Sequence, residues 1–543
     1  MSRLSASTLL PLAIFLLVLV AMLLRVLPEA LTDPWAITED DGRHFVVWLR
    51  AMADPELFRD DPIAAYFGAL TPLPYKWLFL PAVWLGIDVV SWQLLVLAPS
   101  IVALTLWAAN RFLGHYFPDP IIRALCLALM VYVTMDDLVA GLPRSFAMLI
   151  LFAGLLFYLE RRLLALVLVL MLGANIYPAA AIVALSGIGM AGLIAFATER
   201  RIAAAEPLLT LAAVVATLVG LAIFLRSAGA TGEVFSLAEA RQMRIFGPSG
   251  RTQFFDGSGA YTAICSRRGG YLKECPDLPP VLALLIQMGG LTVALMILRK
   301  AVADARSFRL LPGLWAGATI LFLLAYAVAF KAHLPTRYSG TGLSLLLPVG
   351  IAAVAGFLIS HWRQTVRWIG LGLCWMILLG FAQQTLGVWT GDYFRDRNAE
   401  LSAEIRALPK DSIIAGFTRY ADFVPAYTGR AVYVSSELTV PYKKPYFELA
   451  SDRVAVQGRL FSGPVDAVWH ESLAQSGIDY FLEGSGTRSS WKRMALSFES
   501  LASWPGRTVF TQNPSVAAAC RVAGVSEIDL IDAACFAAGL SGK

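Results

Sequence analysis

Long apolar runs recur along most of this chain, and they constrain its fold more than any other feature. About eleven of them approach or reach the roughly 18 to 20 residues that an α-helix needs to cross a ~30 Å hydrocarbon layer. The mean hydropathy of +0.65 and the charged fraction of only 15% exclude a water-soluble enzyme, a disordered chain and a coiled coil. We therefore predict a mainly α, polytopic membrane helix bundle. Its spans fall at residues 8–25, 92–111, 121–134, 145–159, 163–174, 178–197, 207–225, 280–298, 311–330, 341–359 and 368–387.

The distribution of Lys and Arg predicts the orientation of these spans, because cytoplasmic loops of membrane proteins are enriched in both residues. With the amino terminus inside, the short outer turns hold only Arg144, Lys331 and Arg337. The apolar stretch 74–90 could be a twelfth span, but counting it would place the basic turns outside. We interpret it as an interfacial segment, so the topology is N-in/C-out.

Three segments are expected on the outer side: the loops 26–91 and 227–279, and the tail 390–543 that follows the transmembrane domain 1–389. The tail alternates strand-like and helix-like runs, which predicts a small α/β extracytoplasmic domain. The strand-like runs are Ser412–Phe417, Ala431–Ser435 and Ile478–Leu482, and the helix-like runs are Ala399–Ala407 and Val465–Ser476.

Four cysteines lie in these outer segments, where the environment is oxidising. Cys265 and Cys275 share the second loop, and Cys520 and Cys535 share the tail. We predict two local disulfides, Cys265 to Cys275 and Cys520 to Cys535. A zinc site is disfavoured, because paired CxxC spacing and nearby histidines are missing.

The first outer loop carries the acidic pair Asp40 and Asp41 at the head of an amphipathic run that predicts a helix on the membrane surface, with His44 beside it. Glu39, Asp40 and Asp41 either cap this helix and complement its dipole, or adjacent carboxylates there act on a membrane-anchored substrate as general base or metal ligands. A second acidic pair, Asp136 and Asp137, precedes Arg144. The pair either marks a substrate path or is wetted at the interface. Arg144 lies at the start of a helix, where the positive end of the helix dipole repels its charge unless an anion lies beside it.

A basic turn between the ninth and tenth spans holds Lys331, His333, Arg337 and Tyr338. These side chains could bind a phosphate, with Arg337 offering a two-pronged fork. The alternative is that they are snorkelling interfacial anchors. The loop 227–279 adds arginines and aromatic residues that fit a polar substrate or a solvated surface.

Taken together, the chain resembles the GT-C superfamily of membrane glycosyltransferases. The resemblance lies in the long first outer loop with Asp40 and Asp41, the segment Thr71-Pro-Leu-Pro-Tyr-Lys-Trp77, the second acidic turn, the turn Leu334-Pro-Thr-Arg-Tyr338 and the outer tail. It implies sugar transfer from a polyprenyl-phosphate carrier. By position, Asp41 or Asp40 would be the base, and Arg337, Lys331, His333 and Arg144 would neutralise the lipid phosphate.

We therefore expect a glycosyltransferase of a bacterial cytoplasmic membrane. Its partners would be a polyprenyl-phosphate donor, a glycan, lipid or protein acceptor and membrane lipids. The net charge of +5 gives no reason to expect nucleic acid, and no nucleotide cofactor motif is present. Whether a divalent cation is needed stays open. The main alternative is a non-catalytic scaffold, or a subunit that binds or transports lipid-linked glycan.

Overall fold

The computed structural model describes residues 6–199, 205–228, 231–255, 258–273, 275, 277–360, 369–370, 372–373, 376–377, 380, 393–501, 506–525 and 527–541. Most of the predicted span 368–387 therefore lies outside the described residues, and so does the side chain of Asp136.

Helices occupy all of the other predicted spans. They are α1 (Ala6–Thr32), α6 (Val89–Trp92) continued by the π-helical η1 (Gln93–Leu97) and α7 (Ala98–Leu113), α8 (Pro120–Val139), α9 (Phe146–Leu159), α10 (Leu163–Ile176), α11 (Pro178–Glu199), α12 (Ala205–Ala228), α15 (Pro280–Ala301), α16 (Ala305–Ala327) and α17 (Thr336–Ser360). Within the described part, seven helices are long and apolar enough to cross a membrane. Three shorter apolar helices accompany them, at Pro120–Met135, Pro143–Leu159 and Leu163–Ile176. The chain is thus a multi-pass membrane protein by helix length and composition, whereas the count of eleven spans and their orientation remain predictions.

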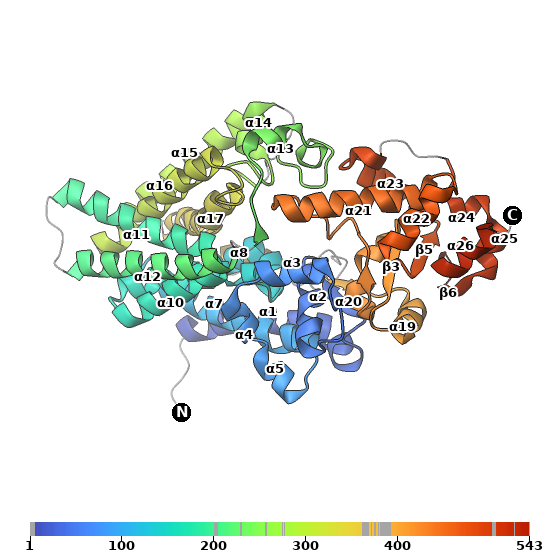
Figure 1. The fold of residues 1–543 in the computed structure, drawn as a ribbon. Helices are drawn as coiled ribbons and strands as arrows, with labels where there is room; N and C mark the ends of the chain where they lie inside the picture. Colours follow the sequence, from blue (N-terminus) through green and yellow to red (C-terminus); the bar gives the residue numbers. More distant parts are fainter. Residues whose placement is uncertain are drawn as a thin grey trace.

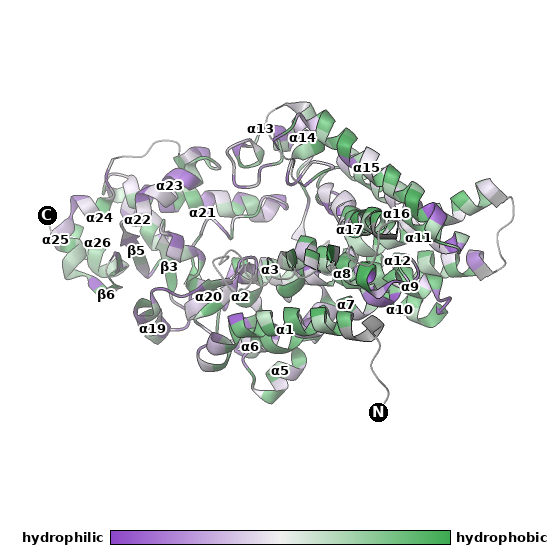
Figure 2. Cartoon of the chain, turned by 180° about the vertical axis from the view of Figure 1, so that it is seen from behind, coloured by the Kyte–Doolittle hydropathy of each residue, from purple (hydrophilic) through white to green (hydrophobic). Residues whose placement is uncertain are grey.

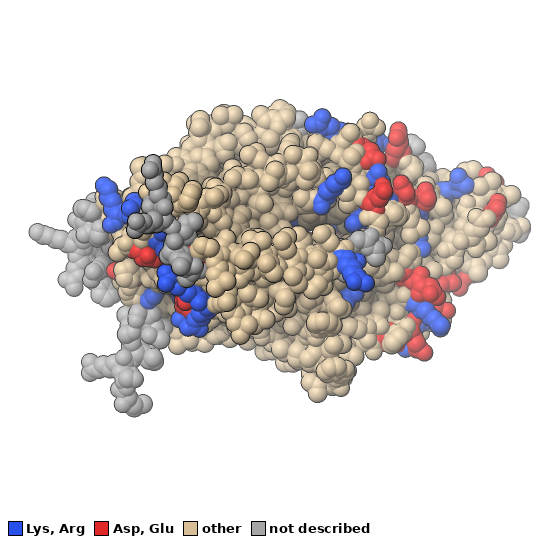
Figure 3. All heavy atoms as spheres, turned by 60° about the vertical axis from the view of Figure 1, so that its left-hand side comes forward, with Lys and Arg blue, Asp and Glu red and all other residues tan. Residues whose placement is uncertain are grey.

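The distribution of polarity agrees with a membrane bundle. The apolar helices form one half of the molecule and the C-terminal domain forms the other, with the two chain ends on opposite sides (Figure 1). Hydrophobic residues dominate α11, α15, α16 and α17, whereas the C-terminal half is mixed (Figure 2). On the face seen in Figure 3, charged side chains gather toward the two ends and leave a broad uncharged stretch between them.

Small residues bring the bundle helices close together. A Cβ at Gly220 of α12 would lie 2.1 Å from the carbonyl oxygen of Met171 in α10, and one at Gly313 of α16 would lie 2.8 Å from that of Gly187 in α11. Glycine permits this close approach of backbones, which favours helix association where the hydrophobic effect contributes little.

The segment 74–90 forms two short helices, α4 (Leu73–Trp77) and α5 (Leu80–Leu85), and Gly86 ends α5 with a φ of +66°. Neither helix is long enough to cross a membrane. Trp77 and Trp84 are 55% and 77% exposed, as is typical of residues at a membrane interface. The structure therefore favours the interfacial interpretation of this segment.

The remainder of the first outer loop is covered by protein. Strand β1 (Ile37–Glu39) pairs antiparallel with β2 (Tyr393–Arg395) and is followed by α2 (Gly42–Ala53) and α3 (Pro62–Leu70). Helix α2 differs from the expected surface helix, because Val46 to Arg50 are all buried. The reason is that both faces of α2 meet protein: Val46, Trp48 and Leu49 belong to the main core, and Val47 belongs to a second cluster with Leu57 and Phe58. Arg50 is buried with them because it pairs with Asp88 at 3.1 Å and lies over the ring of Trp35.

The tail forms the predicted α/β domain around a five-stranded sheet of order β4-β3-β5-β7-β6. Strands β3 (Ile413–Gly416), β4 (Ala431–Val432) and β5 (Tyr480–Gly484) are parallel, and β7 (Ile528–Asp532) runs antiparallel to β5 and to β6 (Arg521–Val525). The main helices are α19 (Ala399–Ala407), α20 (Val424–Thr428), α21 (Lys444–Ser462), α22 (Ala467–Ser476), α23 (Thr487–Ala495), α24 (Val509–Gln512), α25 (Pro514–Ala519) and α26 (Ala533–Ser541). The three predicted strands and both predicted helices are confirmed.

Both predicted disulfides are confirmed. Cys265 and Cys275 lie 5.2 Å apart between their Cα atoms, and Cys520 and Cys535 lie 5.6 Å apart. The first closes part of the loop 227–279, whose described residues include α13 (Leu237–Gln242) and α14 (Gly259–Cys265).

Candidate functional site

Arg144 gathers acidic side chains from two separate parts of the sequence. It lies in the 3-10 turn η2 (Pro143–Ser145), directly before α9. Its Nη2 atom lies 2.8 Å from Oε1 of Glu39, its Nε lies 3.0 Å from Oδ1 of Asp137, and its Nη1 contacts Oδ2 of Asp41. These carboxylates are thus the anions that an arginine at the start of a helix requires. We call these four residues the Arg144 cluster.

The capping role considered for Glu39, Asp40 and Asp41 is filled by Glu39. Its Oε2 atom accepts a hydrogen bond of 2.7 Å from the backbone N–H of Gly42, in the first turn of α2. Asp41 occupies the N-cap position but makes no side-chain capping bond. Its carboxylate is therefore available to Arg144, and 42% of the side chain is exposed.

Asp40 has different ion-pair partners from those of Asp41. Its carboxylate contacts Arg43, whose Nη2 atom also lies 3.5 Å from Glu437 of the C-terminal domain. Arg251, from the second outer loop, pairs with the same glutamate at 2.6 Å. Glu437 therefore joins both outer loops to the C-terminal domain.

His44 strengthens that junction. Its Nε2 atom lies 2.7 Å from the backbone oxygen of Glu437, and its ring stacks on Phe67 at 4.7 Å between centroids. Burial, followed by the positive charge of Arg251, lowers the pKa of His44 to about 4. The imidazole is therefore neutral near pH 7 and acts as a structural contact between the first loop and the C-terminal domain.

A second cluster contains arginines without acidic partners. Arg337, in the first turn of α17, donates to the Tyr177 hydroxyl at 2.6 Å, and Arg268 donates to the Tyr442 hydroxyl at 2.7 Å. His333 lies beside Tyr442, with 5.1 Å between ring centroids. No carboxylate of the described residues lies within 4.0 Å of either guanidinium. We call these five residues the Arg337 cluster.

The turn that carries His333 has an unfavourable backbone. Phe330 and His333 have φ angles of +68° and +59°, and their backbones bond to each other at 3.1 and 3.3 Å. Such conformations cost on the order of 1 to 3 kcal/mol each for residues other than glycine and are frequent at functional sites. The positive charges of Arg337 and Arg268 add to desolvation in lowering the pKa of His333. This imidazole is held neutral beside two cations.

Asp137 connects the two clusters. Its carboxylate pairs with Arg144, and it also lies within electrostatic range of Arg337. The two clusters therefore form one polar region, at the C-terminal end of α8 and the N-terminal ends of α9 and α17.

The structure brings five of the ten predicted site residues into this region. Asp41, Asp137 and Arg144 meet in one cluster, and His333 and Arg337 belong to the other. Lys331 is exposed at the edge and makes no ion pair within the described part of the chain. Tyr338 is 8% exposed, and its hydroxyl donates to the Ala332 oxygen, so it braces the turn.

Three members of the Arg337 cluster were missed as site residues: Tyr177, Arg268 and Tyr442. Glu39 of the Arg144 cluster was grouped with Asp40 and Asp41 but not singled out, and Glu437, which joins the loops to the C-terminal domain, was missed. Arg268 was one of several loop arginines, and Tyr177 stood in a turn that appeared structural. Tyr442 lies in the aromatic-rich segment Val440–Phe447, which was the only signal for it in the sequence.

Carboxylates and imidazoles of the region do not assemble into a metal centre. Among the residues that the structure describes, no group of three or more His, Cys, Asp and Glu side chains could hold a metal ion. The three carboxylates of the Arg144 cluster surround a guanidinium instead.

No protein-family model matches this chain, and no curated protein matches it.

Proposed function

We propose that this protein is a membrane glycosyltransferase that moves a sugar from a polyprenyl-phosphate donor to a glycan, lipid or protein acceptor. The reaction would take place on the periplasmic face of a bacterial cytoplasmic membrane. The observation that carries the proposal is the position of Asp137. It pairs with Arg144, in a cluster with an accessible carboxylate, and it acts electrostatically on Arg337, in a cluster whose arginines have no carboxylate within 4.0 Å among the described residues.

Such a transfer needs a base that accepts the hydroxyl proton and a cation that stabilises the leaving phosphate, and the two clusters offer one group of each kind. The acceptor hydroxyl oxygen attacks the anomeric carbon of the sugar, and the bond from that carbon to the phosphate oxygen breaks. The phosphate leaves with the bonding electrons, while the hydroxyl proton passes to a carboxylate. A guanidinium that no protein carboxylate neutralises can stabilise the negative charge that develops on the phosphate.

Asp41 is the better candidate for the base. Only one of its oxygens contacts Arg144, and no donor among the described residues contacts the other. Asp40 is similarly accessible, but it faces Arg43 and Glu437 rather than the Arg337 cluster. Asp41 is separated from Arg337 only by Arg144 and Asp137.

Binding of a synthetic polyprenyl phosphate, measured by native mass spectrometry with bilayer lipids as competitors, tests the donor site. We expect specific binding to the wild type and its loss in Arg337→Ala. Arg299→Ala, which removes an exposed arginine at the end of α15, is the matched control and should bind normally. Equal, weak binding in all three proteins would overturn the proposal.

Transfer from polyprenyl-phosphate sugars to added acceptors tests the base. We expect Asp41→Asn to abolish transfer with normal expression and folding, and Asp40→Asn to retain part of it. Full activity in both variants would refute the assignment.

One observation favours a second function, a non-catalytic scaffold or a subunit that binds or transports lipid-linked glycan. Asp40 and Asp41 are both engaged in ion pairs with arginines, as structural carboxylates are. A scaffold would bind the lipid but would lose no function in Asp41→Asn, which distinguishes it from a transferase.

A further inference from the structure

We propose that Arg268 is a second phosphate-binding residue, presented by the loop that the Cys265–Cys275 disulfide closes and held in place by Tyr442 of the C-terminal domain. This inference rests on the proposed function, since it concerns the same lipid phosphate. It adds that Arg337 and Arg268, from different segments, together stabilise the doubly charged leaving group more than the singly charged donor.

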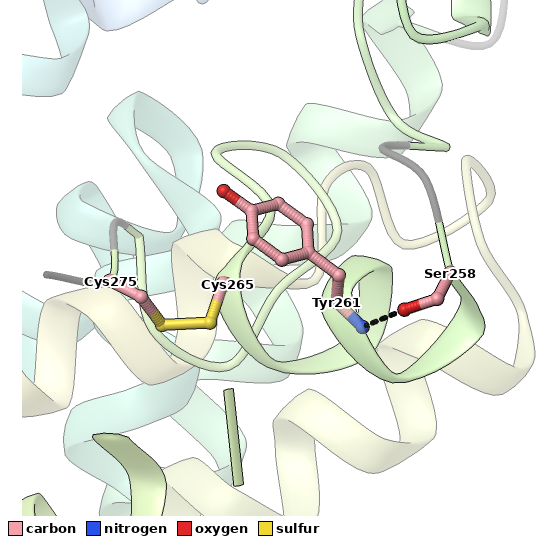
Figure 4. The surroundings of a disulfide bond; sticks show 4 residues. All are labelled: Ser258, Tyr261, Cys265 and Cys275. Carbon is pink, nitrogen blue, oxygen red and sulfur yellow. Dashed lines mark hydrogen bonds between the residues drawn. A yellow bond between two sulfur atoms is a disulfide. The ribbon is translucent and has the colours of Figure 1, made fainter. Parts of the chain in front are cut away.

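The loop that carries Arg268 is fixed at its base. The disulfide joins its two ends directly after α14, and Ser258 caps that helix by accepting a hydrogen bond from the N–H of Tyr261 (Figure 4). Inside the loop, the N–H of Gly270 donates to the Ser266 oxygen at 2.8 Å. Arg268 lies between these two residues, so its backbone position is restricted.

The loop is also fixed to the helix bundle. The Tyr271 hydroxyl lies 2.8 Å from the Thr319 hydroxyl, and Nε1 of Trp315 donates to it at 3.2 Å. Both partners belong to α16, the helix that leads into the turn with His333. Arg268 and His333 are thus positioned by the same helix.

The guanidinium of Arg268 has unused capacity. An arginine has five N–H donors, and the one hydrogen bond that the structure gives this side chain goes to the Tyr442 hydroxyl. Its charge acts on His333, as does that of Arg337. By comparison Arg430, which also has no carboxylate within 4.0 Å in the described chain, donates to backbone carbonyls of residues 406, 408, 428 and 429 and is satisfied.

Two arginines without a nearby carboxylate among the described residues can stabilise the charge that develops when the sugar–phosphate bond breaks. In the donor the phosphate is a diester with a single negative charge, whereas the released monoester carries about −1.5 to −2 at pH 7. The second guanidinium therefore gains most of its interaction when the sugar–phosphate bond breaks, which lowers the barrier rather than tightening donor binding.

Binding of two lipid probes tests this inference: a polyprenyl phosphate monoester and its methyl diester, measured by native mass spectrometry. We expect Arg268→Ala to weaken monoester binding by about tenfold or more and diester binding by only about threefold or less. The neighbouring Arg267 is exposed, so Arg267→Ala is the matched control and should bind both probes like the wild type.

Two further comparisons test how Arg268 is positioned. Tyr442→Phe removes only the hydroxyl and should weaken monoester binding by a smaller factor than Arg268→Ala. The double variant Cys265→Ser with Cys275→Ser should lose monoester affinity, whereas Cys520→Ser with Cys535→Ser, in the distal part of the C-terminal domain, should keep it.

The outcomes separate this inference from the function on which it rests. If the wild type binds neither probe, the proposed function fails and this inference fails with it. If the wild type binds and Arg268→Ala binds equally well, only the role of Arg268 is refuted. Equal losses for the monoester and the diester would refute the charge matching, and displacement of the monoester by millimolar inorganic phosphate would assign the arginines to free phosphate instead.

Discussion

Arg144 and Arg337 lie in neighbouring clusters at the same end of the helix bundle, yet the two guanidinium groups differ in the number of carboxylates around them. Three carboxylates surround Arg144, one of which, Glu39, is only 2% exposed. Arg337 donates to the Tyr177 hydroxyl and has no carboxylate within 4.0 Å in the described part of the molecule, where Asp137 acts on it only from a longer distance. The first arginine is neutralised by the fold, whereas the second keeps its positive charge available.

This difference separates a structural role from a binding role. A buried charge is costly unless a partner offsets it, so the Arg144 cluster must remain intact for the loop 26–91 to fold. An arginine without such a partner contributes little to stability, and its attraction for anions is undiminished. Substitutions that affect stability and lipid binding separately therefore test the comparison.

The largest effect on stability is expected for Arg144→Ala. Removing the guanidinium leaves three carboxylates close together, including buried Glu39, and should cost about 3 to 5 kcal/mol of unfolding free energy. Arg337→Ala should change stability by less than about 1 kcal/mol. Denaturant unfolding in mixed micelles, followed by tryptophan fluorescence, measures both; equal losses in the two variants would contradict the distinction.

A smaller effect is expected from the protonation of His44. Its folded-state pKa of about 4 lies below the ordinary histidine value of 6.5, so the unfolded state binds more protons between these two pH values. Stability is therefore fully present above pH 6.5 and falls as the pH drops toward 4, by at most about 3 kcal/mol. His44→Phe keeps an aromatic ring against Phe67 and should flatten this dependence in thermal unfolding between pH 7.5 and 4.5.

Exposed His115, near the end of α7, provides the control, because His115→Ala should leave the pH dependence unchanged. The titration of Asp61 changes stability in the opposite direction. Because burial raises its pKa to about 6, its contribution to stability increases as the pH falls through that range. Its contribution is common to all three proteins and cancels in the comparison. A wild-type pH dependence in His44→Phe would show that His44 does not report on this junction.

The smallest effect is expected for Lys331→Ala. This exposed lysine lies at the edge of the Arg337 cluster, where solvent screens its charge. Binding of the polyprenyl phosphate should weaken about two- to threefold at ~20 mM salt and be unchanged at ~0.5 M. A loss as large as that of Arg337→Ala, independent of salt, would place Lys331 in direct contact with the phosphate.

Features encoded in short stretches of sequence could be predicted, and those that join distant stretches could not. The apolar helices follow from uninterrupted hydrophobic runs, and the disulfides follow from cysteines close together in each outer segment. Strands β6 and β7 were missed because β6 contains a glycine and β7 contains two aspartates, residue types that are depleted in strands. The burial of α2 was missed because it depends on Asp88 and on Glu437, far along the chain.

The candidate site shows the same limit. Arg144 and Arg337 stood out because positive charge is scarce in the short outer turns, and Asp41 and Asp137 stood out because each belongs to an adjacent acidic pair. Nothing local indicated that Arg144 would face carboxylates on both sides, or that Tyr442 would hold Arg268 from 174 positions away. The sequence thus indicated which residue types were present, but the division between neutralised and unneutralised arginines required the fold.

The pairing of β1 with β2 has a practical consequence for engineering. Glu39 lies opposite Tyr393, and Ile37 lies opposite Arg395, so the segment that begins the C-terminal part of the chain completes the strand directly before the acidic pair. A chimera that exchanges the C-terminal domain should therefore keep Tyr393–Arg395 with its own first loop and place the junction after Arg395. With that junction, the exchanged domain can be varied while the backbone that presents Asp40 and Asp41 keeps its partner.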